Sequence, residues 1–197
     1  MAGIPGAVRA RHMKTLVAGV DALPAADAAA VRARVGPAAL AQIADSAGPE
    51  WLPLELNAAL TRALHDALGV QRSAMFFRAR LGEALRAPLF KAVHDGAVAL
   101  FGLDPSSWLK LVPRGWELVF RGCGAWSKPQ HTAPGVAEIE LRELPPLMTS
   151  DRVWPVSVAA SLSALVDAGK AQGAMELTGF DAKAGRASYV LRWSAKG

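Results

Sequence analysis

The fold is decided by the C-terminal part of the chain, which reads TSDRVWPVSVAASLSALVDAG over residues 149–169 and KAQGAMELTGFDAKAGRASYVLRW over residues 170–193. The first of these segments predicts a helix, because Ser150 or Asp151 can cap its free amides. One apolar stripe then recurs at helical spacing, at Val158, Leu162, Leu165 and Val166. Gly169 follows the last of these residues and predicts a helix end in the left-handed conformation.

Beyond this helix the hydrophobic period changes from 3.6 to 2 residues. Met175 and Leu177 alternate with polar neighbours, and Tyr189, Leu191 and Trp193 do the same after a turn over residues 179–185. Two strands so close in sequence are expected to pair antiparallel. Because an isolated hairpin is marginally stable in water, the pattern also predicts further strands.

Those strands lie upstream of the predicted helix. Residues 137–142 alternate strictly and stop before Pro145, and a weaker strand candidate covers residues 123–132. The predicted order is therefore β-β-α-β-β, in a chain whose earlier part is rich in helix-forming Ala, Leu and Arg. The expected fold class is α+β, with an N-terminal helical layer packed on a C-terminal four-stranded antiparallel sheet. We expect residues 1–50 to form a tail and short helices, and residues 51–194 to form a ligand-binding-like domain that continues from them.

Composition excludes several classes of protein. Apolar residues make up 52 % of the chain, which suits a folded core, and no apolar run is long enough for a membrane span. The net charge of +5 is spread along the chain among acidic residues, so we expect no nucleic-acid partner. The single cysteine fits a reducing compartment, and we expect a cytoplasmic protein.

No catalytic or metal-binding signature is present. The four histidines and the one cysteine do not follow metal-ligand spacings, so we expect no metal and no catalytic residues. Cys123 stands between two glycines, where backbone can approach a ligand closely. Alternatively, His94 and Cys123 are ordinary buried residues, or the reactive groups of an enzyme. The ligand-binding residues that we predict from helical position and composition are Phe90, His94, Phe101, Trp116 and Cys123.

Six tryptophans are many for a chain of this length. Several stand where predicted elements begin or end, so that an indole is half-buried with its N–H satisfied. They either line a hydrophobic pocket, form a dimer face, or belong to ordinary core and rim packing.

Three segments carry a resemblance to a known family. These are the run from Trp51 to Asn57, the run Gly102-Leu103-Asp104-Pro105, and the terminal run from Tyr189 to Trp193. They resemble a family abundant in myxobacteria, which is similar to vinyl-reductase-type small-ligand-binding domains and to haem-NO-binding sensor domains. The resemblance implies helices over a four-stranded antiparallel sheet, a hydrophobic pocket and a homodimer.

These observations lead to a prediction about the cofactor and to three hypotheses about function. The haem sensors carry a Tyr-x-Ser-x-Arg sequence that this chain lacks, so the sequence predicts no cofactor and makes haem doubtful. The leading hypothesis is a bacterial, non-enzymatic regulatory or signalling module that binds a small hydrophobic ligand or a protein partner. The alternative is a structural adaptor that dimerises without a ligand, and a third hypothesis is an enzyme that uses Cys123 or His94.

Overall fold

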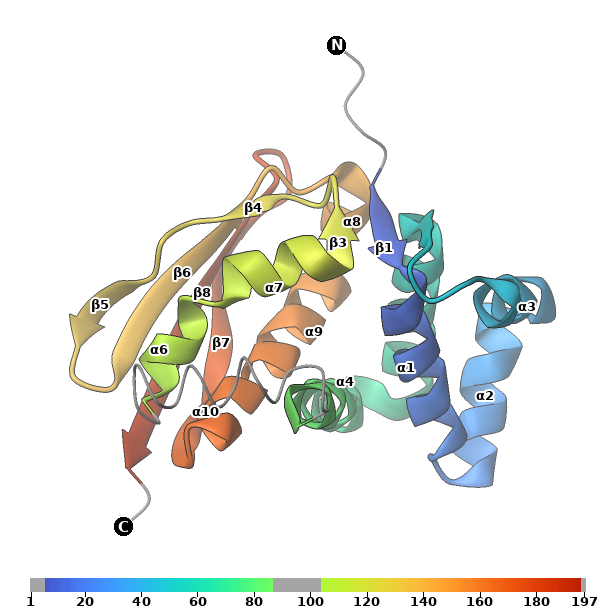
Figure 1. The fold of residues 1–197 in the computed structure, drawn as a ribbon, viewed down its shortest axis with the longest axis horizontal. Coiled ribbons are helices and arrows are strands. Elements are labelled where there is room, and N and C mark those ends of the chain that lie inside the picture. Colours follow the sequence, from blue (N-terminus) through green and yellow to red (C-terminus); the bar gives the residue numbers. More distant parts are fainter. Residues whose placement is uncertain (1–5, 87–103, 196–197) are drawn as a thin grey trace.

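The computed structural model of the chain describes residues 6–86 and 104–195, and Figure 1 shows that they form a helical half and a sheet half. The helical half contains α1 (Ala10–Asp21), α2 (Ala25–Val35), α3 (Pro37–Asp45) and α4 (Leu54–Arg86). The helices of the sheet half are α6 (Pro105–Leu109), α7 (Val112–Val119), α8 (Pro146–Thr149), α9 (Val153–Leu162) and α10 (Ala164–Ala168). The two halves meet where α9 packs against α4 on one side and against the sheet on the other.

The large sheet is antiparallel and has five strands. Four of them lie in the order β4-β6-β8-β7, and the fifth, β5, pairs with the first residues of β6. Its strands are β4 (Ala125–Trp126), β5 (Gln130–Ala133), β6 (Val136–Arg142), β7 (Ala171–Asp181) and β8 (Arg186–Ala195). The prediction of an α+β fold with helices on an antiparallel sheet is confirmed. The predicted strand over residues 123–132 forms as two short strands, β4 and β5, that both pair with β6.

A second, three-stranded sheet was not predicted from the sequence. It joins β1 (Ala7–Arg9), β2 (Trp51–Pro53) and β3 (Phe120–Arg121) in the order β2-β1-β3. These strands have only two or three residues each, too few to show a recognisable alternation. Because β1 pairs with both neighbours, this sheet ties the start of the chain to its middle.

The predicted helix over residues 150–169 is present as α9 and α10. Asp151 lies one residue before the N-cap, Arg152, and its Oδ1 accepts a hydrogen bond of 2.7 Å from the amide of Val153 at the start of α9. All members of its predicted apolar stripe are buried, namely Val158, Leu162, Leu165 and Val166. The predicted end was wrong in one detail, because Gly169 has φ −76° and the left-handed residue is Lys170, with φ 53°.

The hydrophobic residues form two cores that follow the two halves. The core of the helical half joins Val8, Met13, Leu16, Val31 and Ile43 to Leu60, Leu64 and Phe76 of α4. Residues on both sides of position 50 therefore share one core, and the division of the chain at this position stays a prediction. Within the described ranges no helix combines the length and apolar character that a bilayer crossing requires.

Candidate functional site

Aromatic rings gather where the two halves meet, and we call this group the aromatic site. Its rings come from six elements and from both halves of the fold. They are His12 of α1, Trp116 of α7, Phe120 of β3, Trp126 of β4, Trp154 of α9 and Tyr189 of β8. In Figure 1, α7 and α9 lie between the large sheet and α1, where they can present rings to both.

Phe120 is the centre of the site. Its ring centroid lies 4.3 Å from that of Trp116, 6.0 Å from that of Trp154 and 5.7 Å from that of His12. The last two contacts are edge-to-face, which the ring quadrupoles favour. Phe120 also packs against both hydrophobic cores, so it joins the two halves.

A second line of rings runs from α7 onto the large sheet. Trp116 meets Trp126 edge-to-face at 5.6 Å, and Trp126 lies 5.4 Å from Tyr189. Tyr189 lies on the central strand β8 and is 0 % exposed, whereas Trp116 and Trp126 are half-buried. The site therefore extends from half-buried indoles to the interior of the sheet half.

A buried amide crosses the boundary between the halves. Asn57 of α4 accepts a hydrogen bond of 3.0 Å at Oδ1 from the indole Nε1 of Trp154, and its Nδ2 lies 3.5 Å from the sulfur of Met13. A buried polar side chain is stable only when its hydrogen bonds are made. This pairing holds α9 at a defined position against α4 and α1.

Three polar atoms of the aromatic site have no hydrogen-bond partner among the described residues. The indole Nε1 atoms of Trp116 and Trp126 and the hydroxyl of Tyr189 are buried and unpaired. Burial also raises the pKa of Tyr189 and keeps its phenol protonated. Leaving a buried donor unpaired costs about 1–3 kcal/mol per group, so these three groups are the candidates in this site for a hydrogen bond to a ligand or to ordered water.

His12 contributes a neutral imidazole to the site. Burial lowers its pKa to about 4, well below the ordinary value of 6.5, because the charged ring loses solvent. Its contact in the structure is the edge-to-face approach to Phe120. A neutral imidazole is the form that binds metal ions or accepts a hydrogen bond near pH 7.

Cys123 is buried in the core of the sheet half and held by backbone carbonyls. Its thiol lies 3.1 Å from the carbonyl oxygen of Arg121 and 3.7 Å from that of Ala7. Burial raises its pKa to about 11, so the thiolate needed for nucleophilic attack is scarce at neutral pH. The structure therefore gives Cys123 a packing role between β1 and β3.

The five predicted ligand-binding residues have different outcomes. Phe90, His94 and Phe101 lie outside the described residues. Trp116 lies in the aromatic site, and Cys123 lies in the same sheet-side core without a ring contact to it. As ligand-binding residues, all five stay predictions.

The sequence did not identify His12, Asn57, Phe120 or Tyr189. Each is a single polar or aromatic residue in an otherwise ordinary helix or strand, and no spacing links one to another. The only available signal was the number of tryptophans, three of which, Trp116, Trp126 and Trp154, lie in this site. In residues 6–86 and 104–195 no group of histidine, cysteine and acidic side chains is placed to hold a metal ion.

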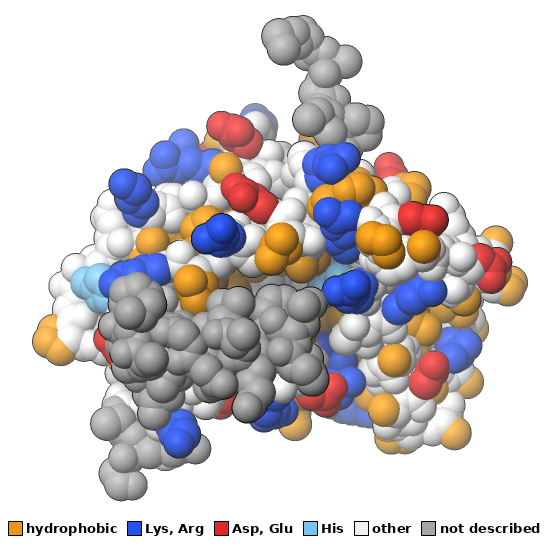
Figure 2. Space-filling model, in the orientation of Figure 1, with side chains coloured by type: hydrophobic (Ala, Val, Ile, Leu, Met, Phe, Trp, Pro, Cys, Tyr) orange, Lys and Arg blue, Asp and Glu red, His pale blue; other side chains and the backbone are white. Residues whose placement is uncertain are grey.

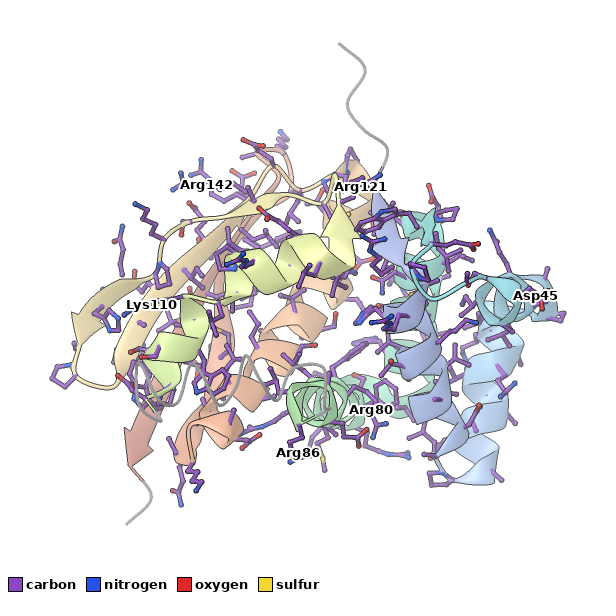
Figure 3. All side chains as sticks on the ribbon, viewed as in Figure 1. Asp45, Arg80, Arg86, Lys110, Arg121 and Arg142 are labelled. Carbon is purple, nitrogen blue, oxygen red and sulfur yellow. The ribbon has the colours of Figure 1, made fainter. Side chains whose placement is uncertain are left out.

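The molecular surface beside the site is partly apolar. On the face drawn in Figure 2, hydrophobic side chains lie among Lys and Arg over α7 and the adjoining helical half. Leu118 of α7 is one of the large exposed hydrophobic residues. Arg121, labelled in Figure 3 at the end of β3, places its guanidinium 4.5 Å from the ring of Trp51, and Arg9 stacks on the same ring at 3.8 Å.

Comparison with known proteins identifies the fold. No protein-family model matches the chain, and no curated protein is similar to it in sequence. Solved structures of H-NOX proteins match nearly all of it. The Fe(II) unliganded H-NOX protein from K. algicida superposes with a TM-score of 0.63 at 7 % identity, covering 95 % of this chain and 97 % of that one. A mutant of the H-NOX from T. Tengcongensis superposes with a TM-score of 0.61 at 11 % identity, covering 94 % and 97 %.

These neighbours overturn the prediction of no cofactor. A further match, described as probing the function of heme distortion in the H-NOX family, covers 96 % of this chain with a TM-score of 0.61 at 10 % identity. The prediction relied on one missing Tyr-x-Ser-x-Arg sequence, and a short motif says less than the agreement of the whole chain with a fold that carries haem in those proteins. The chain has the haem-NO-binding-like fold of the H-NOX structures.

Proposed function

We propose that this chain is a non-enzymatic regulatory module that holds a flat, hydrophobic small ligand at the aromatic site, and that haem is the first ligand to test. The observation that carries the proposal is the line of unpaired buried donors at Trp116, Trp126 and Tyr189 inside a fold whose solved neighbours are H-NOX proteins. Relation to the myxobacterial family is part of the same proposal.

The chemistry of the site suits haem in its donor set. Haem iron is held by imidazole, thiolate, thioether or phenolate groups. Of the described candidates, His12 is neutral and free to bind, whereas burial keeps Cys123 and Tyr189 protonated. When bound, haem supplies an iron that takes a diatomic ligand or an electron. The protein residues would hold the iron through His12 and cover the macrocycle with Phe120 and the indoles.

The spacing of the rings sets a condition. Phe120 touches Trp116 and Trp154 at centroid distances of 4.3 and 6.0 Å, which leaves no slot for a macrocycle between them. A bound haem therefore requires these rings to move apart. Loss of their mutual contacts would be offset by the apolar area that the ligand buries.

The test is a haemin titration followed by absorption spectroscopy, in which the Soret band of each histidine variant is compared with that of the unmodified protein. We expect a shifted Soret band that saturates at one equivalent, is lost in His12→Ala and is kept in His131→Ala, whose ring is exposed on β5. A band that survives His12→Ala but is lost in His94→Ala keeps haem and rejects His12 as its ligand.

The absence of saturable haemin binding would reject haem. Native mass spectrometry of the same sample then separates the remaining possibilities. A retained small molecule whose binding weakens in Tyr189→Phe supports a different ligand at this site. An empty dimer supports a structural adaptor in place of a sensor.

A further inference from the structure

A groove on the outside of the molecule is independent of the aromatic site. It has a volume of about 590 Å³ and is bounded by α4, α9 and β7. The walls come from the part of α4 that follows the break in the helix at Gly69, and from the outward face of α9.

Small side chains make this groove hollow. Val70, Ala74 and Arg78 recur at intervals of four along α4, and Arg152, Val156 and Ala160 recur likewise along α9. Each set forms one face of its helix. Ala74 is the middle residue of the first set and Ala160 is the last residue of the second, so small side chains line both helical walls of the groove.

The rim of the trough exposes large apolar side chains. Val70 is 61 % exposed and Met75 is 67 % exposed, and both line the groove. Among the described residues, the only other exposed large hydrophobic residues are Leu118 and Leu147. Exposed apolar residues around a concave apolar surface are typical of a protein-binding site.

The groove is charged at both ends, but the two ends differ. Arg78 is paired with Asp167 at 2.8 Å, and Glu176 lies 3.8 Å from Arg192. Arg152, at the other end, is exposed and forms no ion pair with any described residue. Of the charged side chains that line the groove, Arg152 is therefore the one without an ion-pair partner in the described part of the chain.

The shape selects the kind of partner. The groove runs beside the ten residues of α9, a length of about 15 Å at 1.5 Å per residue, which matches about three turns of a bound helix. A helix is about 10 Å across and can cover a wider apolar surface than a single acyl chain can.

We propose that this groove binds an amphipathic helix of a partner protein, with a carboxylate near the end that meets Arg152. The apolar face of the partner helix lies on Ala74, Ala160 and Met175, and Val70 and Met75 close over its sides. Methionine at the floor and at the rim lets the surface adapt to different apolar residues.

The test uses synthetic helical peptides on the full chain. The probe is a set of peptides with leucine at i, i+3, i+4 and i+7 and glutamate elsewhere, compared with the same peptides carrying lysine in place of glutamate. The five methionines of the chain permit methyl NMR, which reports where a peptide binds. We expect the methyl signals of Met75 and Met175 to shift with the acidic peptides and binding to weaken as salt is raised.

Variants locate the contact. Arg152→Glu and Met75→Glu are each expected to weaken binding of the acidic peptide by tenfold or more. Arg34→Glu is the control, since Arg34 is exposed on α2 and the charge change is the same. It is expected to change affinity by less than twofold.

Four outcomes would overturn the proposal. The first is that lysine peptides bind as tightly as glutamate peptides, and the second is that only the methyl signals of other methionines shift. The third is that no acidic peptide binds at millimolar concentration. The fourth is that palmitate or anionic vesicles cause the same shifts of the Met75 and Met175 signals. None of these four outcomes depends on haemin binding. The peptide proposal can therefore be wrong while the proposed function is right, and the proposed function can be wrong while the peptide proposal is right.

Discussion

The indole Nε1 of Trp154 donates a hydrogen bond of 3.0 Å to Oδ1 of Asn57, and this bond links the helix α9 of the sheet half to α4 of the helical half. Both residues are buried. The bond is a direct polar link across the boundary between the two hydrophobic cores. It fixes the spacing at which the rings of the aromatic site meet.

Asn57→Ala is expected to lower the free energy of unfolding by about 1–3 kcal/mol, because it leaves a buried indole N–H unpaired. Urea denaturation of Asn57→Ala, Trp154→Phe and the double variant measures the coupling. We expect the double variant to be more stable than the sum of the single effects predicts, by about 1 kcal/mol. Additive effects within a few tenths of a kcal/mol would show that the bond adds nothing.

Stability should depend on pH through His12. The unfolded chain takes up a proton on this ring near pH 6.5, whereas the folded protein resists it until about pH 4. The contribution of the neutral ring is fully present above pH 6.5 and is lost as the pH falls toward 4. Since the ring keeps some solvent contact, we expect a loss of about 1–2 kcal/mol, below the full linkage value.

Urea denaturation at pH 7.5 and pH 4.5 tests this dependence on His12. The loss on acidification should be smaller by that amount in His12→Gln. His131→Gln, which alters an exposed ring, should follow the unmodified protein. An unchanged pH profile in His12→Gln would assign the acid sensitivity to other groups.

Removal of the Tyr189 hydroxyl should stabilise the ligand-free protein. Because this oxygen is buried and unpaired, Tyr189→Phe is expected to raise the free energy of unfolding by about 1 kcal/mol. Ser163→Ala is the contrasting variant. The Ser163 hydroxyl donates to Ala159 O at 3.0 Å and accepts from the amide of Met175 at 2.9 Å, so its loss should cost about 1–3 kcal/mol. Destabilisation by Tyr189→Phe would indicate that the hydroxyl is satisfied by bound water.

The thiol of Cys123 should react slowly in the folded protein. Its pKa of about 11, against an ordinary 9.0, lowers the thiolate fraction at pH 8 by about a hundredfold. Alkylation by iodoacetamide is therefore expected to be at least that much slower in buffer than in 8 M urea. As the chain has one cysteine, mass spectrometry reads the reaction directly. Equal rates would revive the hypothesis that Cys123 is a reactive group.

Gly124 is expected to tolerate no side chain. It has φ 88°, and an added Cβ would lie 2.4 Å from the carbonyl oxygen of Arg142. Gly124→Ala should therefore cost more than 2 kcal/mol through strain and displacement of β6. Gly115→Ala, in α7 with open space around its Cβ, should instead stabilise the helix by about 0.5–1 kcal/mol. Thermal unfolding of the two variants in parallel should give shifts of Tm in opposite directions.

The sequence by itself determined the local elements whose periodicity is uninterrupted. The stripe from Val158 to Val166 and the alternation around Tyr189 predicted α9, α10 and the β7-β8 hairpin, since burial of one face leaves a period of 3.6 or 2 in the chain. The α+β class followed, because a hairpin and one upstream strand need a sheet and the sheet needs a helix over it. Strands β1 and β3 are too short to show a pattern, so the sequence did not predict them.

Only the tertiary structure decided which residues meet. Asn57 and Trp154 are 97 residues apart, and no spacing rule connects them. His12, Phe120 and Tyr189 likewise come together only because α1, β3 and β8 converge. Burial in that shared environment, and not residue type, makes His12 neutral and leaves the Tyr189 hydroxyl unpaired. The candidate site is built from single residues of many elements, so it can be recognised only once the chain is folded.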